Sequence, residues 1–181
     1  MEYSKMLAEY GPAMSEQEVA AFVAECRQKS VRNQNAEVYK LCYSTIDLTT
    51  LTEKDSVESV GKFVKKAVDF NTHFPNIPNV ASICVFPLFV DTVGLGVEGT
   101  DIGVTSVAAG FPASQTFLEV KMLEVAMAIE NGADEVDIVM NVGKVLTGNY
   151  DEVAAEVEVI KKEMGDDVVL KVILETGLLR K

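Results

Sequence analysis

Short apolar runs alternate with amphipathic stretches over most of the chain, beginning near residue 41. Apolar runs of about four to eight residues are typical of strands buried on both faces, whereas apolar positions three and four residues apart are typical of helices. The strand-like runs span residues 41–46, 80–86, 102–108, 135–140 and 168–174. Runs of this kind separated by helices predict a parallel sheet, and therefore an α/β protein.

The segments between these runs have helical spacing and recognisable ends. The expected helix starts are Thr52 with Asp55, the position after Ser114, and Asn149 with Glu152, and the expected ends are residues 131–132 and 164–165. A shorter helical turn should follow Pro87. Before residue 41, Ser15 and Glu18 form a capping box, and apolar residues follow at positions 19, 22, 23 and 26. We therefore expect an N-terminal helical extension over residues 1–40.

An open doubly wound sheet and a closed (β/α)8 barrel both produce this alternation. The charges within two strand-like runs favour a barrel, because Asp137 interrupts the run 135–140 and Lys171 interrupts the run 168–174. Side chains alternate between the two faces of a strand, so each charge shares its face with residues two positions away. A barrel interior accommodates a few polar groups near the C-terminal ends of its strands. We therefore assign residues 41–181 to a barrel domain.

Asp137 and Lys171 are the first candidates for chemistry. Burying an unpaired ion costs several kcal/mol, so a carboxylate and an ammonium in two strands are expected to meet in one polar site. A structural ion pair that fixes the strand register is the alternative. Asp47, at the end of the first run, is a third carboxylate that we expect at the C-terminal edge of a strand, although such a residue is often a turn or cap residue.

Composition narrows the classes of partner. The formal net charge of −12 argues against nucleic acid, because nucleic-acid binding depends on Lys and Arg at the phosphates. Three widely spaced cysteines and a single histidine support neither a disulfide framework nor a zinc site. No signal-peptide pattern is present, and no apolar run approaches the roughly 20 residues of a membrane span. We expect a cytoplasmic protein that binds neither nucleic acid nor a membrane.

A glycine pattern offers a third fold hypothesis. Gly94, Gly96 and Gly99 match the letters of the dinucleotide-binding fingerprint, which would indicate an open phosphate- or nucleotide-binding domain. That fingerprint follows a strand and opens a helix, whereas these glycines precede the strand-like run 102–108. We therefore interpret them as a loop. Cys84, inside the run 80–86, has the pattern of a small core residue rather than of a nucleophile.

Five segments together resemble the deoxyribose-phosphate aldolases. They are DLTTL from Asp47, ASICVFP from Ala81, AGFP from Ala109, GADEVDIVMNVG from Gly132 and LKVILETGLL from Leu170. The resemblance extends from about residue 41 to the end. It implies a TIM (β/α)8 barrel that reversibly cleaves the small phosphorylated sugar 2-deoxyribose 5-phosphate into glyceraldehyde 3-phosphate and acetaldehyde. It also implies a lysine Schiff base as the electron sink, and no metal or cofactor.

The resemblance also implies roles for single residues. Asp137, in the EVD segment, corresponds to the carboxylate that relays protons, and Asp47 to an aspartate of the same proton network. Lys171 corresponds to a lysine that lines this catalytic pocket. Thr49 and Cys84 are the predicted substrate-binding residues. We do not assign Lys171 as the nucleophile, because a nearby Asp137 would keep its ammonium charged.

The sequence departs from the family in one large respect. The family's imine-forming lysine belongs to a KTSTG-like segment and the lysine that assists it to a GFKP-like segment, and neither occurs here. We therefore expect an incomplete barrel of about five strands, with little aldolase activity as an isolated polypeptide. Its uncovered strand edges should promote association into a homo-oligomer. The alternative is a non-catalytic barrel fragment that acts as an oligomerising module.

Overall fold

Five parallel strands form one sheet in the computed structural model, which describes residues 14–179. The strands are β1 (Asp47–Thr49), β2 (Ser82–Val85), β3 (Gly103–Val107), β4 (Glu135–Val139) and β5 (Val169–Ile173). Each strand pairs with the next one along the chain, so the spatial order is the sequence order. This order is that of a barrel rather than of a doubly wound sheet, in which the strand order reverses. The predicted α/β class and the barrel assignment are confirmed.

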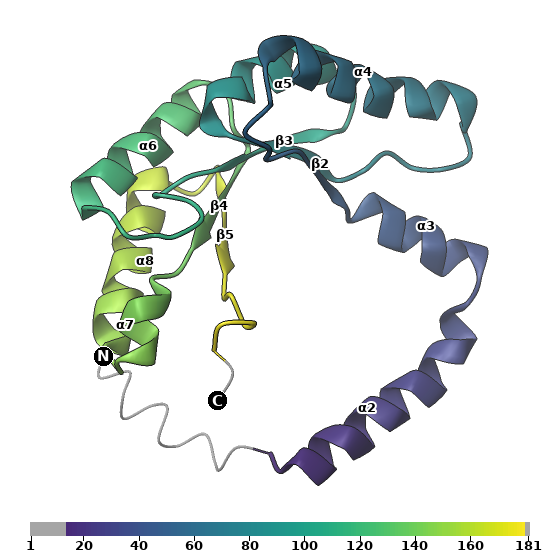
Figure 1. Ribbon diagram of the computed structural model, residues 1–181. Helices are drawn as coiled ribbons and strands as arrows, with labels where there is room; N and C mark the ends of the chain where they lie inside the picture. Colours follow the sequence, from purple (N-terminus) through teal and green to yellow (C-terminus); the bar gives the residue numbers. More distant parts are fainter. Residues whose placement is uncertain (1–13, 180–181) are drawn as a thin grey trace.

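The helices of the barrel cover the outer face of the sheet. Its helical elements are α4 (Val57–His73), η2 (Pro87–Phe89), α5 (Val90–Val97), α6 (Leu118–Glu130), α7 (Val142–Leu146) and α8 (Tyr150–Met164). Figure 1 shows α4, α5, α6 and α8 outside the curved sheet, with the strands on the inner side. In the described part of the chain the sheet curves without closing, so the molecule is an incomplete barrel.

The core lies between the sheet and this outer layer of helices. Ile83, Val104 and Val136 point outward from their strands and are almost completely buried. They belong to one cluster with helix residues such as Val64 of α4 and Val93 of α5. Alternate positions of the same strands point to the inner face. The outward positions therefore supply the packing, and the inner positions are available for polar groups.

The glycine pattern lies in a helix, so its interpretation as a loop is wrong for two of the three glycines. Gly94 and Gly96 are part of α5, and only Gly99 follows that helix. A Cβ atom on Gly96 would lie 2.5 Å from Cγ1 of Val64, so this glycine allows α5 to pack closely against α4. Its role in the described structure is helix packing, not phosphate binding.

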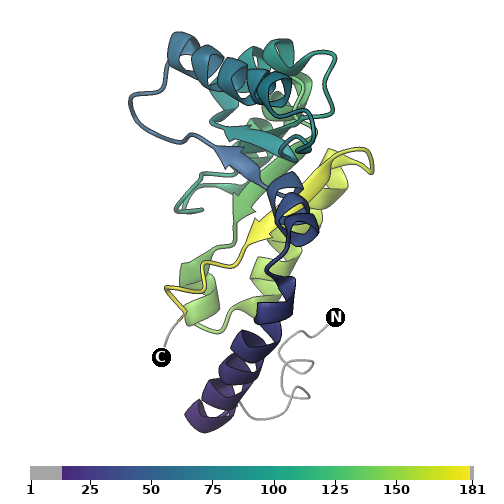
Figure 2. The same cartoon turned by 90° about the vertical axis from the view of Figure 1, so that its right-hand side faces the viewer.

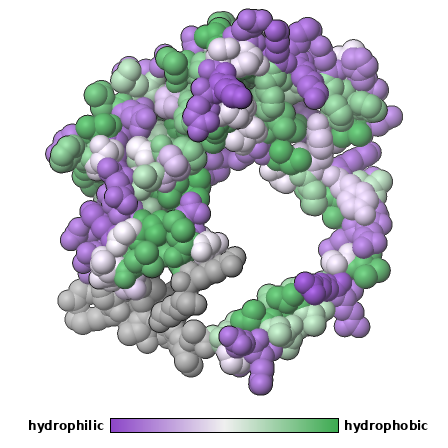
Figure 3. Space-filling model, in the orientation of Figure 1, coloured by the Kyte–Doolittle hydropathy of each residue, from purple (hydrophilic) through white to green (hydrophobic). Residues whose placement is uncertain are grey.

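Two helices precede the sheet, α2 (Glu16–Ser30) and α3 (Ala36–Ser44), joined by η1 (Val31–Asn33). The capping box of Ser15 and Glu18 forms as predicted. None of the 15 residues of α2 is buried, and its apolar residue Phe22 is 59% exposed. Figures 2 and 3 show α2 extending away from the sheet, with hydrophobic side chains on its surface and a hollow between it and the sheet.

The interpretation of residues 41–46 as a strand is wrong. These residues include the end of α3, whose N-cap Asn35 accepts a hydrogen bond from the backbone N–H of Val38. The ring of Tyr43, on α3, stacks against Phe70 of α4 at 5.3 Å, so the apolar run serves helix packing. The first strand therefore starts at Asp47. The helix α3 continues across residue 40, so the expected boundary lies inside a helix. The division into a helical extension, 1–40, and a barrel domain, 41–181, stays a prediction.

One predicted helix start is displaced, and another is correct in position but lacks its predicted capping hydrogen bonds. The Asp55 carboxylate accepts a hydrogen bond from the Thr52 backbone N–H at 3.0 Å, but this contact forms a loop, and Ser56 caps α4 instead. Asn149 does precede α8, yet its side chain makes no capping hydrogen bond there, and Glu152 forms an ion pair with Lys144. At α8 another polar partner therefore holds the side chain that the local pattern assigned to the cap.

No helix of the described residues combines the length and the apolar character that crossing a membrane requires.

Candidate active site

One polar side chain from each strand contributes to a closed ring of contacts on the inner face of the sheet. We call these residues the inner ring: Asp47, Ser82, Thr105, Glu135 and Lys171. The Ser82 hydroxyl donates to Asp47 Oδ1 at 2.8 Å and lies 2.7 Å from the Thr105 hydroxyl. The Thr105 hydroxyl donates to Glu135 Oε2 at 3.4 Å. The ammonium of Lys171 closes the ring, because it contacts both Glu135 and Asp47.

Lys171 lies among three carboxylates, which together with it form the carboxylate cluster. Its Nζ atom donates a hydrogen bond to Asp47, lies 2.8 Å from Glu135 Oε2 and lies 3.1 Å from Asp137 Oδ1. Asp137 and Lys171 are directly opposite one another in the β4–β5 register. The expectation that these two charges share one face is therefore confirmed. One ammonium among three carboxylates leaves the cluster with a surplus of negative charge when all are ionised.

The environment separates the pKa values of two of these carboxyl groups. Burial alone would raise the pKa of Asp47, but hydrogen bonds from Lys171 and Ser82 outweigh it and lower the pKa below its ordinary value. Burial raises the pKa of Asp137, and the nearby Lys171 offsets this only in part. Asp137 Oδ1 is buried and, although Lys171 is within ion-pair distance, receives no aligned hydrogen bond. Two carboxyl groups with divergent proton affinities are typical of an acid–base site, and Asp137 is the one suited to exchange a proton.

The ammonium of Lys171 is held in its charged form. Burial alone would lower its pKa, but hydrogen bonds to Asp47 and Glu135 and the charge of Asp137 raise the pKa above its ordinary value. An amine attacks a carbonyl group only when it is unprotonated. This geometry therefore fits a lysine held among carboxylates and does not fit a Schiff-base nucleophile, which agrees with the expectation from the sequence that Lys171 is not the nucleophile.

Thr49 and Cys84 lie beside one another, paired in the β1–β2 register. Cys84 is buried, and burial together with the negative charge of Asp137 raises the pKa of its thiol to about 12. A thiol of this pKa is not a nucleophile near neutrality. Thr49 is exposed, and its hydroxyl donates to the backbone carbonyl of Asp47. Both side chains lie on the inner face of the sheet, where Thr49 is exposed and Cys84 is enclosed.

Asp47 lies at the opposite end of its strand from the one we expected. It is the first residue of β1, not a residue at the C-terminal edge of a strand. The difference follows from the misassigned run 41–46, since a strand ending at residue 46 would have put Asp47 just beyond it. Asp47 nevertheless contacts the cluster, because the long side chain of Lys171 reaches it across the curved sheet.

Three polar residues of this face were missed in the sequence. Glu135 is two residues before Asp137, so the same alternation that placed Asp137 on the inner face also placed Glu135 there. Ser82 and Thr105 are small polar residues inside buried runs, and both are fully buried. Their signal was a hydroxyl at a position where the neighbouring residues are apolar.

A second lysine is buried in the layer of helices. Lys121 of α6 is 0% exposed, and its Nζ donates to the Ser114 hydroxyl at 2.7 Å and to Glu156 Oε1 of α8 at 2.6 Å. Lys144 of α7 lies 3.1 Å from Glu152 and 3.9 Å from Glu156. We call Lys121, Lys144, Glu152 and Glu156 the helix-layer cluster. It contains as many cations as anions.

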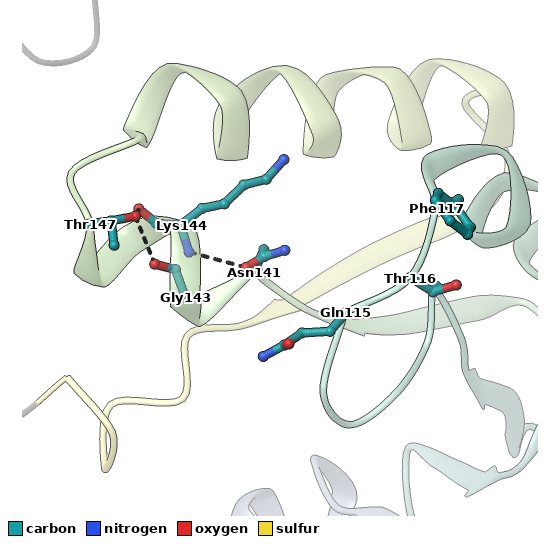
Figure 4. A pocket seen from close by; sticks show the side chains of 7 residues that line it. All are labelled: Gln115, Thr116, Phe117, Asn141, Gly143, Lys144 and Thr147. Atoms are coloured by element: carbon teal, nitrogen blue, oxygen red, sulfur yellow. Dashed lines mark hydrogen bonds between the residues drawn. The ribbon is translucent and has the colours of Figure 1, made fainter.

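A polar cavity of about 500 Å³ lies between the β3–α6 loop and the segment that follows β4. Figure 4 shows Gln115, Thr116 and Phe117 on one side of it, and Asn141 and Lys144 on the other. The Asn141 side chain accepts a hydrogen bond from the backbone N–H of Lys144, so it serves as the N-cap of α7. None of the predicted site residues lines this cavity, and its lysine is paired within the helix-layer cluster.

Several known proteins similar to this chain are deoxyribose-phosphate aldolases, and no protein-family model matches it. A deoxyribose-phosphate aldolase of Clostridium tetani is 39% identical over 134 residues, which cover 74% of this chain and 58% of the relative. The human deoxyribose-phosphate aldolase is 39% identical over 145 residues, which cover 74% of this chain and 45% of that protein. The chain is homologous to the deoxyribose-phosphate aldolases. It spans about half the length of the curated relatives that it matches.

Solved structures of aldolases share the fold. A putative deoxyribose-phosphate aldolase from Coccidioides immitis superposes with a TM-score of 0.67 at 28% identity, covering 76% of this chain and 50% of that one. The deoxyribose-phosphate aldolase of Aeropyrum pernix, described as a tetramer, gives a TM-score of 0.62 at 27% identity, covering 81% and 57%. These partial coverages agree with an incomplete barrel.

One relative extends into the N-terminal helices. A putative deoxyribose-phosphate aldolase of Caenorhabditis elegans is 33% identical over 174 residues, which cover 95% of this chain and 57% of that protein. Since only about a twentieth of the chain lies outside this match, the match includes most of residues 1–40. The expectation that the resemblance begins near residue 41 was therefore too narrow.

Proposed function

We propose that the inner face of β1–β5 provides the proton-transfer and substrate-contacting part of a deoxyribose-phosphate aldolase site. The reaction is the reversible cleavage of 2-deoxyribose 5-phosphate into glyceraldehyde 3-phosphate and acetaldehyde through a lysine Schiff base. Asp137 relays protons, Asp47 stays ionised beside it, and Thr49 and Cys84 contact the substrate. The observation that carries the proposal is the carboxylate cluster, in which Asp137 and Asp47 have opposite shifts of pKa.

The chemistry explains why such a cluster is useful. Breaking a carbon–carbon bond beside an imine requires a base that removes a proton from a hydroxyl group and returns one to the new carbanion. A carboxyl group whose pKa is raised by burial accepts and donates protons more readily near neutrality than an ordinary one. The three free cysteines of the described residues agree with the reducing, cytoplasmic setting that we propose.

Lys171 has a supporting role in this proposal. It is the only lysine on β1–β5 of the described residues, and its ammonium is held by three carboxylates. The nucleophilic lysine is therefore supplied from outside these five strands. A polypeptide of residues 1–181 should accordingly show little retro-aldol turnover by itself.

Two measurements test the proposal. Purified polypeptide 1–181, incubated with acetaldehyde and borohydride, should give no adduct on Lys171 by mass spectrometry, and a stoichiometric adduct there would contradict the assignment. A chimera that continues this chain with the remaining part of the C. tetani relative should cleave 2-deoxyribose 5-phosphate. Asp137→Asn should abolish that turnover, whereas Glu130→Gln, on the exposed end of α6, should preserve it. Equal activity of the Asp137→Asn chimera would refute the role of Asp137.

A second candidate function, an oligomerising module, is favoured by the free edges of the sheet. β1 and β5 each pair with a single strand in the described structure, so each has a row of unpaired backbone groups. Beside β5 lies a groove of about 670 Å³, lined by apolar residues that include Val153, Val157 and Leu174. Light scattering should detect association that Leu174→Glu weakens, since Leu174 is 56% exposed. The control Leu88→Glu changes a residue that is 78% exposed on η2, away from this groove, and should have no effect.

A further inference from the structure

Glu135 is the member of the carboxylate cluster to which the proposed function assigns no role. It enters from the start of β4, two residues before Asp137 on the same face of the strand. Its Oε2 atom lies 2.8 Å from Nζ of Lys171, which is closer than the 3.1 Å from Nζ to Asp137 Oδ1. Its side chain is 28% exposed, whereas that of Asp137 is 14% exposed. Glu135 is therefore the less buried carboxylate but has the shorter contact with the ammonium.

The inner ring fixes Glu135 in this position. The Thr105 hydroxyl donates to Glu135, and Thr105 is itself held by the fully buried Ser82. Ser82 in turn donates to Asp47, which binds Lys171 from the opposite side. Each link is on a different strand, so the geometry is set by the register of the whole sheet. A short hydrogen-bonded chain anchored on several strands is a stiff way to position a carboxylate.

We propose that Glu135 is a positioning residue that controls how strongly Asp137 holds a proton, by competing with Asp137 for the ammonium of Lys171. The ammonium could direct one of its three N–H groups to each carboxylate, but its position is set by Asp47 and Glu135, and Nζ lies closer to Glu135 than to Asp137. In this position Oδ1 of Asp137 receives no aligned hydrogen bond. The negative charge of Glu135 also opposes the ionisation of Asp137 directly. Both effects favour the protonated form of Asp137.

The other groups that face Asp137 define the background for this effect. Asp47 from β1 opposes its ionisation, Lys171 from β5 favours it, and Cys84 from β2 is a neutral thiol near pH 7. Thr105 of β3 is uncharged. Glu135 is thus one of two carboxylates near Asp137, and its removal leaves Asp47 still bound to Lys171.

The test is a titration of the Asp137 carboxyl group, followed by carbon-13 NMR in polypeptide 1–181 and assigned by the loss of its signal in Asp137→Asn. Glu135→Gln keeps the size of the side chain and removes its charge. We expect the pKa of Asp137 to fall, because the repulsion disappears and Lys171 can direct an N–H to Asp137. Glu135→Asp restores a negative charge and should return the pKa towards that of the parent. An Asp137 pKa that is unchanged or raised in Glu135→Gln would overturn the proposal.

A matched control separates this local effect from a change in net charge. Glu130→Gln makes the same substitution at an exposed position of the outer helix α6, and the pKa of Asp137 should stay unchanged there. If Glu135→Gln fails to fold, the second variant is Thr105→Val, which removes the hydroxyl that donates to Glu135. The pKa of Asp137 should fall in this variant as well, and an unchanged value there would overturn the proposal.

This inference rests on the proposed function only for the role of Asp137 as the proton relay. The titration requires no substrate and no turnover. A failure of the aldolase assignment, seen as an inactive chimera, would therefore leave the NMR result intact. A failure of the Glu135 proposal would leave the activity of the chimera intact.

Discussion

Lysines and carboxylates form clusters in two places in the described part of the chain, and the two surroundings differ in their balance of charge. In the helix-layer cluster two lysines meet two glutamates, and Lys121 is completely enclosed. In the carboxylate cluster one lysine, 31% exposed, meets three carboxylates. The first arrangement satisfies each charge with a partner from a neighbouring helix. The second leaves a surplus of negative charge on a face that is open to solvent.

This difference separates a structural role from a chemical one. A buried ion pair with balanced charges joins α6 to α8 and can be replaced by apolar residues of similar size without great loss. An unbalanced cluster holds carboxyl groups whose proton affinities diverge, which costs stability and is typical of functional sites. A buried lysine alone therefore does not indicate a functional site, whereas an excess of carboxylates around one lysine does.

The largest expected effect is on the helix-layer cluster. Glu156→Gln leaves the ammonium of Lys121 fully buried without a negative charge in contact, with only the neutral amide and the Ser114 hydroxyl as acceptors. We expect the free energy of unfolding to fall by about 3–5 kcal/mol, measured by urea denaturation followed by circular dichroism. The control Glu158→Gln, at an exposed position of the same helix, should change it by less than about 0.5 kcal/mol. If Glu156→Gln lowered the free energy of unfolding no more than Glu158→Gln does, the burial of Lys121 would not depend on its ion pair with Glu156.

A smaller effect is expected when the cation of the carboxylate cluster is removed. Lys171→Met leaves three carboxylates without a counter-charge, but solvent reaches this face, so we expect a loss of about 2 kcal/mol at neutral pH. In the parent, Asp47 has a lowered pKa in the folded state, so its contribution to stability is present above its unfolded value of 3.8 and is lost as the pH falls. The variant lacks this contribution.

The difference in stability between the parent and Lys171→Met should therefore narrow below about pH 4. Urea denaturation at a series of pH values measures it. Lys62→Met, which breaks the exposed pair with Glu58 on α4, is the control and should cost at most about 0.5 kcal/mol. A difference that widens as the pH falls would contradict the assignment of Lys171 as the partner of Asp47.

The smallest effect is expected from replacing a whole pair. Lys121→Met combined with Glu156→Leu should leave the free energy of unfolding within about 1 kcal/mol of the parent, because the apolar side chains fill the same space. The corresponding double change in the other cluster, Lys171→Met with Asp137→Leu, leaves Asp47 and Glu135 without a cation and should be clearly less stable. If both double variants retained parental stability, the distinction between the two clusters would fail.

Much of the fold was predictable from the chain because its signals are local. Four of the five strand-like runs are strands, and the capping box at Ser15 marks the start of α2. The fifth run, 41–46, failed because a short apolar run fits a helix as well as a strand. The cap at Asn35 and the contact between Tyr43 and Phe70 both favour the helix. The start of α4 was placed too early because the contact between Thr52 and Asp55 forms in a loop, and Ser56 caps the helix instead.

The candidate site was predictable in part. Opposite charges within two strands predicted that Asp137 and Lys171 meet, and they do. The buried Lys121 gave no signal, since its position on an amphipathic helix is indistinguishable from a solvent-facing one until α8 packs against it. Glu135 could have been found by extending the alternation by one step. Its contact with Lys171 depends on the register of β4 and β5, which places Lys171 one diagonal step from Glu135.

The sequence by itself determined the alternation of strands and helices, the kinship with aldolases, and the presence of opposite charges on adjacent strands. These properties follow from periodicity and residue type, which act over a few neighbouring positions. The tertiary structure alone decided that three carboxylates share one ammonium, that Asp47 reaches it from the first strand, and that Lys121 is enclosed. Such contacts join residues up to 124 positions apart, so the curvature and register of the whole sheet set them.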